Sequence, residues 1–252
     1  MNNPVRRKLL NREPSIGTWI QIGHPTVAEI LGDLDFDWIA ADCEHTEMSI
    51  GEFAAITRAL HGRGPAPFVR VRENDTLAIR QALDVGAYGV IVPLVSSKAE
   101  AERAVAAAKF PPAGVRGFAY YRANGHGADF DAYVATANEE IAVVAMVETR
   151  AAVEAIDEIL SVDGLDGVFI GPYDLSGSYG IPGQTGHESV RAAQRSVVDA
   201  CRRAGKSAGL HIVVPSAEEV SRALEMGFTF LAVGMDTVYL RDGGLAAGKS
   251  IS

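Results

Sequence analysis

The arrangement of short apolar segments along the chain is the feature that most restricts its fold. Eight such segments are rich in β-branched and aromatic residues, which is typical of strands buried on both faces of a parallel sheet. They begin at Ser15, Asp37, Pro67, Tyr88, Ile141, Asp166, Lys206 and Phe228. Helical patterns fill most of the gaps, over 27–33, 50–60, 76–85, 99–108, 151–159, 188–204 and 217–226. Eight units in 252 residues favour an α/β fold, the (β/α)8 TIM barrel, over an open doubly wound sheet.

The composition agrees with one soluble domain that spans residues 1–252. Hydrophobic residues make up 48% of the chain, and no linker or composition shift divides it. The net charge of −9 argues against a surface for nucleic acid or an anionic membrane. Two cysteines cannot build a disulfide framework, and we find neither an apolar signal segment nor a bilayer-length apolar run. These features predict a cytoplasmic protein.

One connection, residues 110–140, is longer than the others and contains Pro-Pro, several glycines and three tyrosines. Long excursions of this kind often serve an active site. A packing segment or a contact between subunits is an equally good interpretation.

In barrels of this class, active sites lie at the carboxyl ends of the strands. Polar residues at or just beyond the predicted strand ends are Asp42, Glu44, His45, Arg70, Arg72, Glu148, Tyr173, Asp174 and His211. Asp84 lies elsewhere, near the end of a helix. We therefore expect most of these side chains to meet at the barrel mouth.

Glu148 and Asp174 are the candidate metal ligands. Each follows a buried strand, and no His or Cys cluster accompanies them. Two converging carboxylates suit a hard divalent cation such as Mg²⁺ or Mn²⁺. Alternatively, either acid caps the helix that follows it.

Arg70, His45 and His211 have a structural and a functional interpretation each. An arginine inside a barrel needs an anion or a carbonyl oxygen, so Arg70 contacts substrate, pairs with Asp42 or Glu44, or does both. His45 at a strand end can act as a general base or be a structural histidine. His211 can reach the pocket or simply pack, and Cys43 should face away from the axis.

Lysine provides a negative argument. An imine-forming aldolase needs a lysine at the catalytic end of a strand. The chain's lysines begin a strand or fall on helices and tails; they are Lys8, Lys98, Lys109, Lys206 and Lys249. An imine mechanism is therefore not expected.

Five segments together resemble the class II, metal-dependent pyruvate aldolases of the HpcH/HpaI family. They are DWIAADCEHTEMS, PFVRVRENDTLAIRQALDVGAYGVIVPLV, FPPAGVRGFA, VVAMVETRAAVEAIDEIL and VDGLDGVFIGPYDLSGSYG. The resemblance covers roughly residues 17–236, and its D-x-EH, ETR and GP-x-DLS motifs form a specific set.

The resemblance implies a role for each matching residue. Glu148 and Asp174 correspond to the ligands of a divalent metal, Mg²⁺, Mn²⁺ or Co²⁺, and Arg70 to the residue that contacts the keto oxygen. His45, with Asp84 as its partner, corresponds to the base system, which acts through a metal-bound water; in the family Asp84 can come from the neighbouring subunit. The segment Gly171, Pro172, Tyr173 and Asp174 corresponds to the seat of the substrate carboxylate. The implied partners are a pyruvate-like 2-oxo acid, an aldehyde and further copies of the chain, as a hexamer.

Residues that select the aldehyde are predicted from loop position alone. They are Phe118, Tyr120, Tyr121, Arg122 and Leu210.

Two departures from the family pattern stand out. Met146 replaces a glutamine usually found two residues before the metal glutamate. The chain also ends in the glycine-rich LRDGGLAAGKSIS, where relatives have a clear helix, so the terminal helix and the hexamer built on it are less expected here. A decarboxylase or lyase acting on oxaloacetate, and a metabolite-binding protein without turnover, remain as alternatives to an aldolase.

Overall fold

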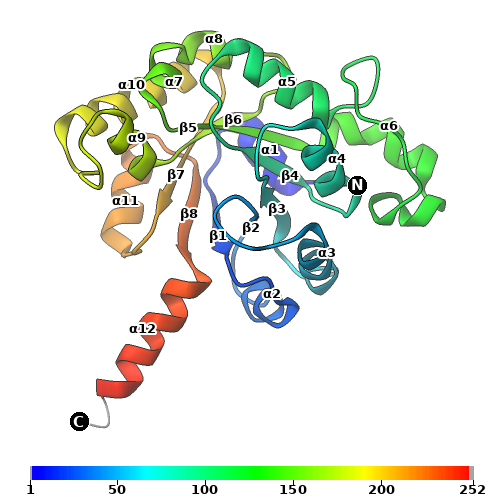
Figure 1. Ribbon diagram of the computed structural model, residues 1–252, viewed down its shortest axis with the longest axis horizontal. Helices are drawn as coiled ribbons and strands as arrows, with labels where there is room; N and C mark the ends of the chain where they lie inside the picture. Colours follow the sequence, from blue (N-terminus) through cyan, green and yellow to red (C-terminus); the bar gives the residue numbers. More distant parts are fainter. Residues whose placement is uncertain (1, 250–252) are drawn as a thin grey trace.

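The computed structural model describes residues 2–249 and forms a closed barrel of eight parallel strands (Figure 1). Each strand pairs with the next in sequence, and β8 pairs with β1. The strands are β1 (Ser15–Ile20), β2 (Trp38–Asp42), β3 (Ala66–Arg70), β4 (Gly89–Val92), β5 (Ala142–Val147), β6 (Gly167–Ile170), β7 (Ser207–Ile212) and β8 (Phe230–Met235). All eight predicted strands are present, and the predicted (β/α)8 barrel is confirmed.

Helices alternate with the strands and form an outer layer (Figure 1). They are α1 (Pro4–Asn11), α2 (Pro25–Gly32), α3 (Ile50–Ala59), α4 (Thr76–Asp84), α5 (Lys98–Ala108), the 3-10 helix η1 (Arg122–Gly127), α6 (Phe130–Glu140), α7 (Arg150–Glu154), α8 (Ile156–Leu160), α9 (Pro172–Ser178), α10 (Glu188–Ala204), α11 (Ala217–Met226) and α12 (Asp236–Lys249). The helix predicted over 151–159 is divided at Ala155 into α7 and α8. Within residues 2–249, no helix has the length and apolar character that crossing a membrane requires.

Large aromatic rings fill the barrel interior, and glycines on neighbouring strands make room for them. Trp38 stacks on Phe230 with ring centroids 4.3 Å apart. A Cβ at Gly17 would lie 2.1 Å from the Trp38 ring, and one at Gly89 would lie 2.2 Å from Phe68. Any larger residue at these glycines would overpack the core.

A helix absent from the predicted set closes the amino-terminal end of the barrel. Val5 and Leu9 of α1 belong to the same buried cluster as the interior rings. Asn3 caps this helix by accepting hydrogen bonds from the backbone N–H groups of Val5 and Arg6. The interior therefore opens at the carboxyl ends of the strands.

The long excursion, residues 110–140, folds into η1 and α6 on the outside of the barrel. Arg122 donates hydrogen bonds to the backbone carbonyls of Thr57 and Val85, near the carboxyl ends of α3 and α4. Those helix ends lie at the amino ends of the strands, because each helix runs antiparallel to its strand. The packing interpretation is thus the one that the structure supports within this chain.

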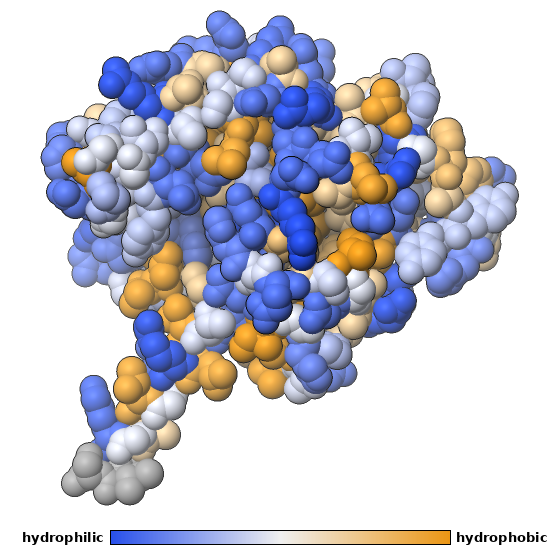
Figure 2. All heavy atoms as spheres, viewed as in Figure 1, coloured by the Kyte–Doolittle hydropathy of each residue, from blue (hydrophilic) through white to orange (hydrophobic). Residues whose placement is uncertain are grey.

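The carboxyl-terminal segment differs from the expectation. It forms a helix, α12, that extends away from the barrel (Figure 1). Its first residue, Asp236, is buried and accepts hydrogen bonds from the backbone N–H groups of Gln21 and Ile22. Further out, Leu240 and Leu245 are exposed, and apolar side chains are visible along the helix (Figure 2). The expectation that no clear terminal helix forms was wrong; the last residues, 250–252, lie outside the described part.

Candidate active site

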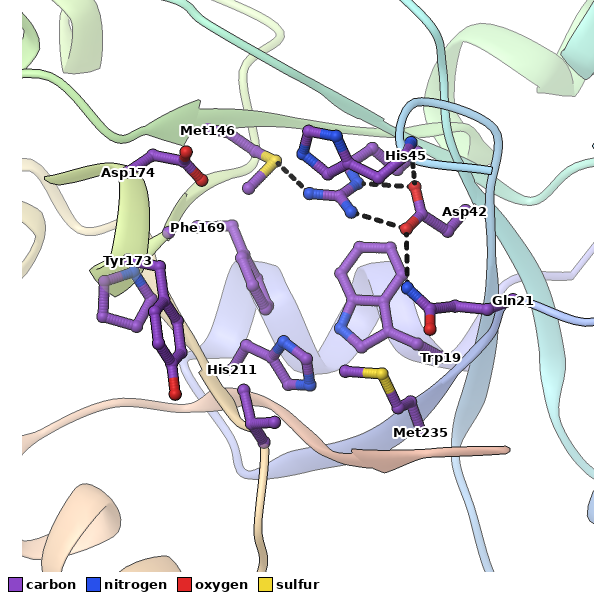
Figure 3. Close-up of a pocket in the computed structure, with 14 residues that line it drawn as sticks. Trp19, Gln21, Asp42, His45, Met146, Phe169, Tyr173, Asp174, His211 and Met235 are labelled. Carbon is purple, nitrogen blue, oxygen red and sulfur yellow. Dashed lines mark hydrogen bonds and ion pairs between the residues drawn. The ribbon is translucent and has the colours of Figure 1, made fainter. Parts of the chain in front are cut away.

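A cavity of about 280 Å³ opens at the carboxyl ends of the strands (Figure 3). Strands β1, β2, β3, β5, β6, β7 and β8 contribute to its walls, directly or through the loops that follow them. The lining residues are Trp19, Gln21, Asp42, His45, Arg70, Met146, Phe169, Gly171, Pro172, Tyr173, Asp174, His211, Val213 and Met235. The barrel thus brings residues from most of the sequence to one small space.

Asp42 and Arg70 form a two-point ion pair across β2 and β3. Arg70 Nη2 lies 2.7 Å from Asp42 Oδ2, and Nε lies 3.0 Å from Oδ1. Burial acts to raise the pKa of Asp42, but the hydrogen bonds and charge of Arg70 outweigh it and hold the pKa below its usual range. The internal pair that the sequence suggested for Arg70 is confirmed.

The same arginine still faces the cavity. Its guanidinium carbon lies 4.9 Å from the centre of the Trp19 ring, and Nη1 lies 3.3 Å from Glu44 Oε2. Nη1 also lies 3.9 Å from the sulfur of Met146, which is a weak acceptor. Arg70 is therefore held in a fixed position while its charge faces the space where a ligand would bind.

Three further carboxylates, those of Glu44, Glu148 and Asp174, lie close enough to affect one another. Burial raises the pKa of Glu148 to about 7; a hydrogen bond from the Leu94 N–H opposes this, and the charges of Glu44 and Asp174 add to it. Burial likewise raises the pKa of Glu44 to about 6, against the effect of Arg70. The site thus holds more negative charge than Arg70 can balance.

This donor set fits a divalent cation. Glu148 is 2% exposed, and Glu44 Oε2 is buried with an ion pair to Arg70 but no hydrogen bond. Oxygen ligands alone, with negative charge in excess, are what Mg²⁺ and Mn²⁺ prefer. Among residues 2–249 no group of three His, Cys, Asp or Glu side chains is arranged as a metal site. Glu148 and Asp174, the two carboxylates that the sequence predicted as ligands, are the candidates to hold such an ion.

His45 and Asp84 are far apart in the architecture of one chain. His45 is half exposed at the mouth, with Nε2 3.6 Å from Glu44 Oε2. Asp84 ends α4, at the opposite end of the barrel, where Arg116 Nη2 lies 2.7 Å from its Oδ1. One chain alone does not bring the predicted base and its predicted partner together.

The segment from Gly171 to Asp174 is at the mouth, as predicted. Tyr173 and Asp174 lie in the first turn of α9, whose leading N–H groups lack intrahelical partners, as in any helix, and receive no side-chain cap. A Cβ at Gly171 would lie 2.8 Å from Glu148 Oε2, so this glycine lets the carboxylate approach the turn.

Strand alternation separates Leu210 from the cavity. Leu210 packs against the outer cluster between barrel and helices and lines a neighbouring cavity, while His211 lines both cavities. None of the predicted aldehyde-selecting residues Phe118, Tyr120, Tyr121 and Arg122 lines this cavity in the chain.

Several lining residues had no signal in the sequence. Trp19 belongs to β1, Gln21 follows β1, and Met235 ends β8, and all three are uncharged. The closure of β8 onto β1 brings them together at the mouth. The strand-end rule places them near the mouth, but no charge or motif marked them as candidates.

A closed barrel with carboxylates and an anchored arginine at its mouth is the site expected of a carbon–carbon lyase. Residues 15–242 match the HpcH/HpaI aldolase/citrate lyase family, and the chain belongs to this family. The resemblance noted in the sequence is thereby confirmed.

The chain is similar to the 5-keto-4-deoxy-D-glucarate aldolase of Escherichia coli O139:H28. The two are 37% identical over 242 residues, which cover 94% of this chain and 93% of the relative. A family protein from Burkholderia cenocepacia J2315 has the same fold, with a TM-score of 0.95 at 29% identity over 99% of both chains. The citrate synthase SbnG superposes with a TM-score of 0.85 at 28% identity, covering 98% of this chain and 97% of that one.

The Asp42–Arg70 pair yields a stability prediction. We expect Asp42→Asn to lower the free energy of unfolding at neutral pH by about 3 kcal/mol, the low end for breaking a buried pair, because Glu44 remains near Arg70. The folded-state pKa of Asp42 is lowered, so its contribution is complete above its ordinary value of 3.8 and is lost as pH falls through the folded pKa. The difference in free energy of unfolding between wild type and Asp42→Asn should therefore become smaller in strong acid.

Urea unfolding followed by tryptophan fluorescence measures both effects. The control is Asp199→Asn, which removes the exposed partner of Arg202 and should change stability by less than about 1 kcal/mol. An Asp42→Asn loss as small as that of the control would contradict the prediction.

Proposed function

We propose that the protein is a divalent-metal-dependent aldolase that makes or cleaves 4-hydroxy-2-oxo acids through a pyruvate-type enolate. The observation that carries the proposal is the group of three carboxylates, Glu44, Glu148 and Asp174, beside the anchored Arg70 at the barrel mouth. Membership of a family of aldolases and citrate lyases supports it.

In this proposal Glu148 and Asp174 hold the metal ion, which, when bound, acts as a Lewis acid toward the oxo acid. The uncapped first turn of α9 offers N–H groups to the substrate carboxylate. Arg70 places a fixed positive charge where the keto oxygen gains negative charge.

His45, with Asp84 as its partner, drives removal of a proton from the methyl carbon next to the keto group. The resulting enolate carbon attacks the aldehyde carbon, a carbon–carbon bond forms, and the aldehyde oxygen takes up a proton. In the cleavage direction the same steps run backwards, so that the 4-hydroxyl loses its proton and the bond between C3 and C4 breaks.

The relative's name suggests the substrate class. Numbered from the carboxyl group beside its ketone, 5-keto-4-deoxy-D-glucarate is a 2-oxo acid with a hydroxyl at C4. At 37% identity over nearly the whole chain, a substrate of this type is the best supported for the present protein. A cytoplasmic location remains a prediction from the sequence.

One observation favours a second candidate function, which is lyase or decarboxylase activity on oxaloacetate. The citrate synthase SbnG shares the fold at 28% identity, and its name describes a reaction whose electrophile is not an aldehyde. Lyase or decarboxylase activity on oxaloacetate would use the same carboxylates and arginine. Loss of CO2 from oxaloacetate without any aldehyde would distinguish it.

We also propose that the active sites are completed between subunits of a homo-oligomer, with a hexamer as the expected assembly. The helix α12 extends from the barrel with Leu240 and Leu245 exposed, which suits packing on another copy. Asp84 is oriented by the fully buried Arg116 at the end of the barrel remote from its own His45. A neighbouring copy could bring the two together.

Mixing two inactive variants tests this arrangement. His45→Ala and Asp84→Ala should each lose most activity, and subunit exchange between them should restore part of it, since some sites regain both groups. Activity is measured after mixing, and unmixed samples taken through the same exchange conditions are the control. No recovery despite proven subunit exchange would contradict the shared site.

Metal binding is tested by calorimetry with Mn²⁺. Wild type should bind one ion per chain, and Glu148→Ala and Asp174→Ala should each abolish tight binding, because each removes one of two charged ligands. Glu154→Ala, which removes an exposed carboxylate paired with Arg150, is the matched control. Unchanged Mn²⁺ affinity in both ligand variants would exclude the proposed metal site.

The proton-transfer step is tested without an aldehyde by following exchange of pyruvate methyl protons with D2O by NMR. Wild type should exchange only with metal present. His45→Ala should slow exchange by roughly 10²–10⁴, the contribution of a general base. Arg70→Ala should slow it by about 10²–10³ through loss of oxyanion stabilisation.

Two outcomes of this experiment would count against the aldolase proposal. Metal-independent exchange, or trapping of pyruvate on a lysine by borohydride, would indicate an imine mechanism. Complete absence of exchange would favour a binding protein without turnover, and Met146→Gln would then be the first variant to examine.

A further inference from the structure

His211 faces the active-site cavity but has no part in the proposed metal binding or proton transfer. Its orientation follows from strand alternation in β7. Gly209 faces the barrel interior, since a Cβ there would lie 2.5 Å from the Phe169 ring. Leu210 and Ile212 then face the helices, and His211 faces the cavity.

The imidazole ring of His211 is held in place from two sides. Its Nε2 lies 3.3 Å from the backbone carbonyl oxygen of Gly234, and its ring centre lies 5.9 Å from that of Trp19. Gly234 lies where the pairing of β8 with β1 shifts register, which frees this carbonyl from the regular ladder. Its φ of +66° and a Cβ position only 2.4 Å from the Tyr239 ring both require glycine.

The bond to Gly234 fixes the tautomer. A carbonyl oxygen can only accept, so Nε2 carries the proton and Nδ1 carries a lone pair. Burial lowers the pKa of His211 to about 4, so the ring is neutral at pH 7. In Figure 3 one ring nitrogen lies on the side of β8 and the other faces the cavity. No described residue hydrogen-bonds Nδ1.

A neutral acceptor of this kind selects a hydrogen-bond donor. A ligand hydroxyl can donate to Nδ1, whereas a carboxylate would face a lone pair. The amide of Gln21, which also lines the cavity, is already engaged: it donates to Asp42 and accepts from the Thr237 hydroxyl. The β7 side of the cavity is thus suited to a hydroxyl group.

The position of His211 identifies which part of a substrate it would meet. The charged groups Arg70, Glu148 and Asp174 come from β3 and from the ends of β5 and β6. A second cavity shares Pro172, Tyr173, His211 and Val213 with the active-site cavity and is also lined by Leu210 and by charged side chains of α10 and α11, among them Arg191, Arg195 and Arg222. A substrate whose oxo-acid end lies at the charged groups can therefore extend past His211, with its aldehyde-derived part against the ring.

We propose that His211 is a specificity-determining residue that accepts a hydrogen bond from a hydroxyl on the aldehyde-derived part of the substrate. The preferred acceptors are then 2-hydroxyaldehydes rather than aldehydes of the same size without the hydroxyl. This inference rests on the proposed aldolase function.

The test compares glycolaldehyde with propanal, which replaces the hydroxyl by a methyl group, each with pyruvate and metal. The quantity measured is the ratio of the two kcat/KM values within each variant. Intrinsic reactivity of the aldehydes and general losses of activity cancel when these ratios are compared. His211→Leu should lower the glycolaldehyde preference by about 3- to 10-fold, the effect of one neutral hydrogen bond.

Three further variants make the result specific. His211→Phe keeps an aromatic ring without an acceptor and should lower the ratio as His211→Leu does. His211→Gln can donate to Gly234 through its amide nitrogen and accept through its oxygen, so it should restore most of the preference. His61→Leu removes an exposed histidine in the connection that follows α3, at the other end of the barrel, and should leave the ratio unchanged.

The possible failures are distinguishable. If wild type exchanges pyruvate protons in D2O but the ratio is the same in wild type, His211→Leu and His211→Phe, the role of His211 is overturned and the aldolase proposal stands. If wild type shows no exchange, the aldolase proposal itself fails.

Discussion

The Asp42 carboxylate connects the barrel to the chemistry at its mouth. As the last residue of β2 it accepts hydrogen bonds from Arg70 on β3 and from the backbone N–H groups of Glu44 and His45. A buried carboxylate is tolerated only when its charge is compensated, so Arg70 is kept in place by the fold itself. The same carboxylate sets the turn that carries Glu44 and His45. Backbone geometry and charge compensation together therefore preorganise the charged half of the site.

Residues at strand ends were predictable because a parallel barrel imposes simple rules. Once eight strands are assigned, their carboxyl ends must meet, which is why Arg70, Glu148 and Asp174 could be grouped from sequence. It was harder to predict which of two adjacent strand residues faces the barrel interior. Leu210 and His211 are adjacent, and the sequence GLHI does not show which one faces inward. The orientation depends on Gly209, which has no side chain and so leaves room for the Phe169 ring of a neighbouring strand inside the barrel. This is a tertiary contact.

The excursion and the terminal helix also differ from what the sequence predicted, each for its own physical reason. The excursion follows α5 and precedes β5, so it joins the amino end of the barrel; this rule could have been applied to the sequence alone. The helix α12 could not have been anticipated in the same way. Its glycines cost roughly 1 kcal/mol each relative to alanine. The helix nevertheless begins where Asp236 is bound by the backbone of residues 21 and 22, a contact between the two ends of the barrel sequence.

The cavity is electrostatically divided, and the division follows the order of the strands. On one side Arg70 is paired with Asp42 and Glu44, and its contact with Met146 is to the sulfur, which is a weak and uncharged acceptor. On the other side, β7, β8 and β1 contribute the neutral ring of His211, with Trp19 and Met235. Charges that develop during carbon–carbon bond cleavage are concentrated on the oxo-acid fragment. Within this cavity the other fragment therefore meets shape and neutral hydrogen bonds, while the charged side chains of Arg191, Arg195 and Arg222 line only the second cavity beyond His211.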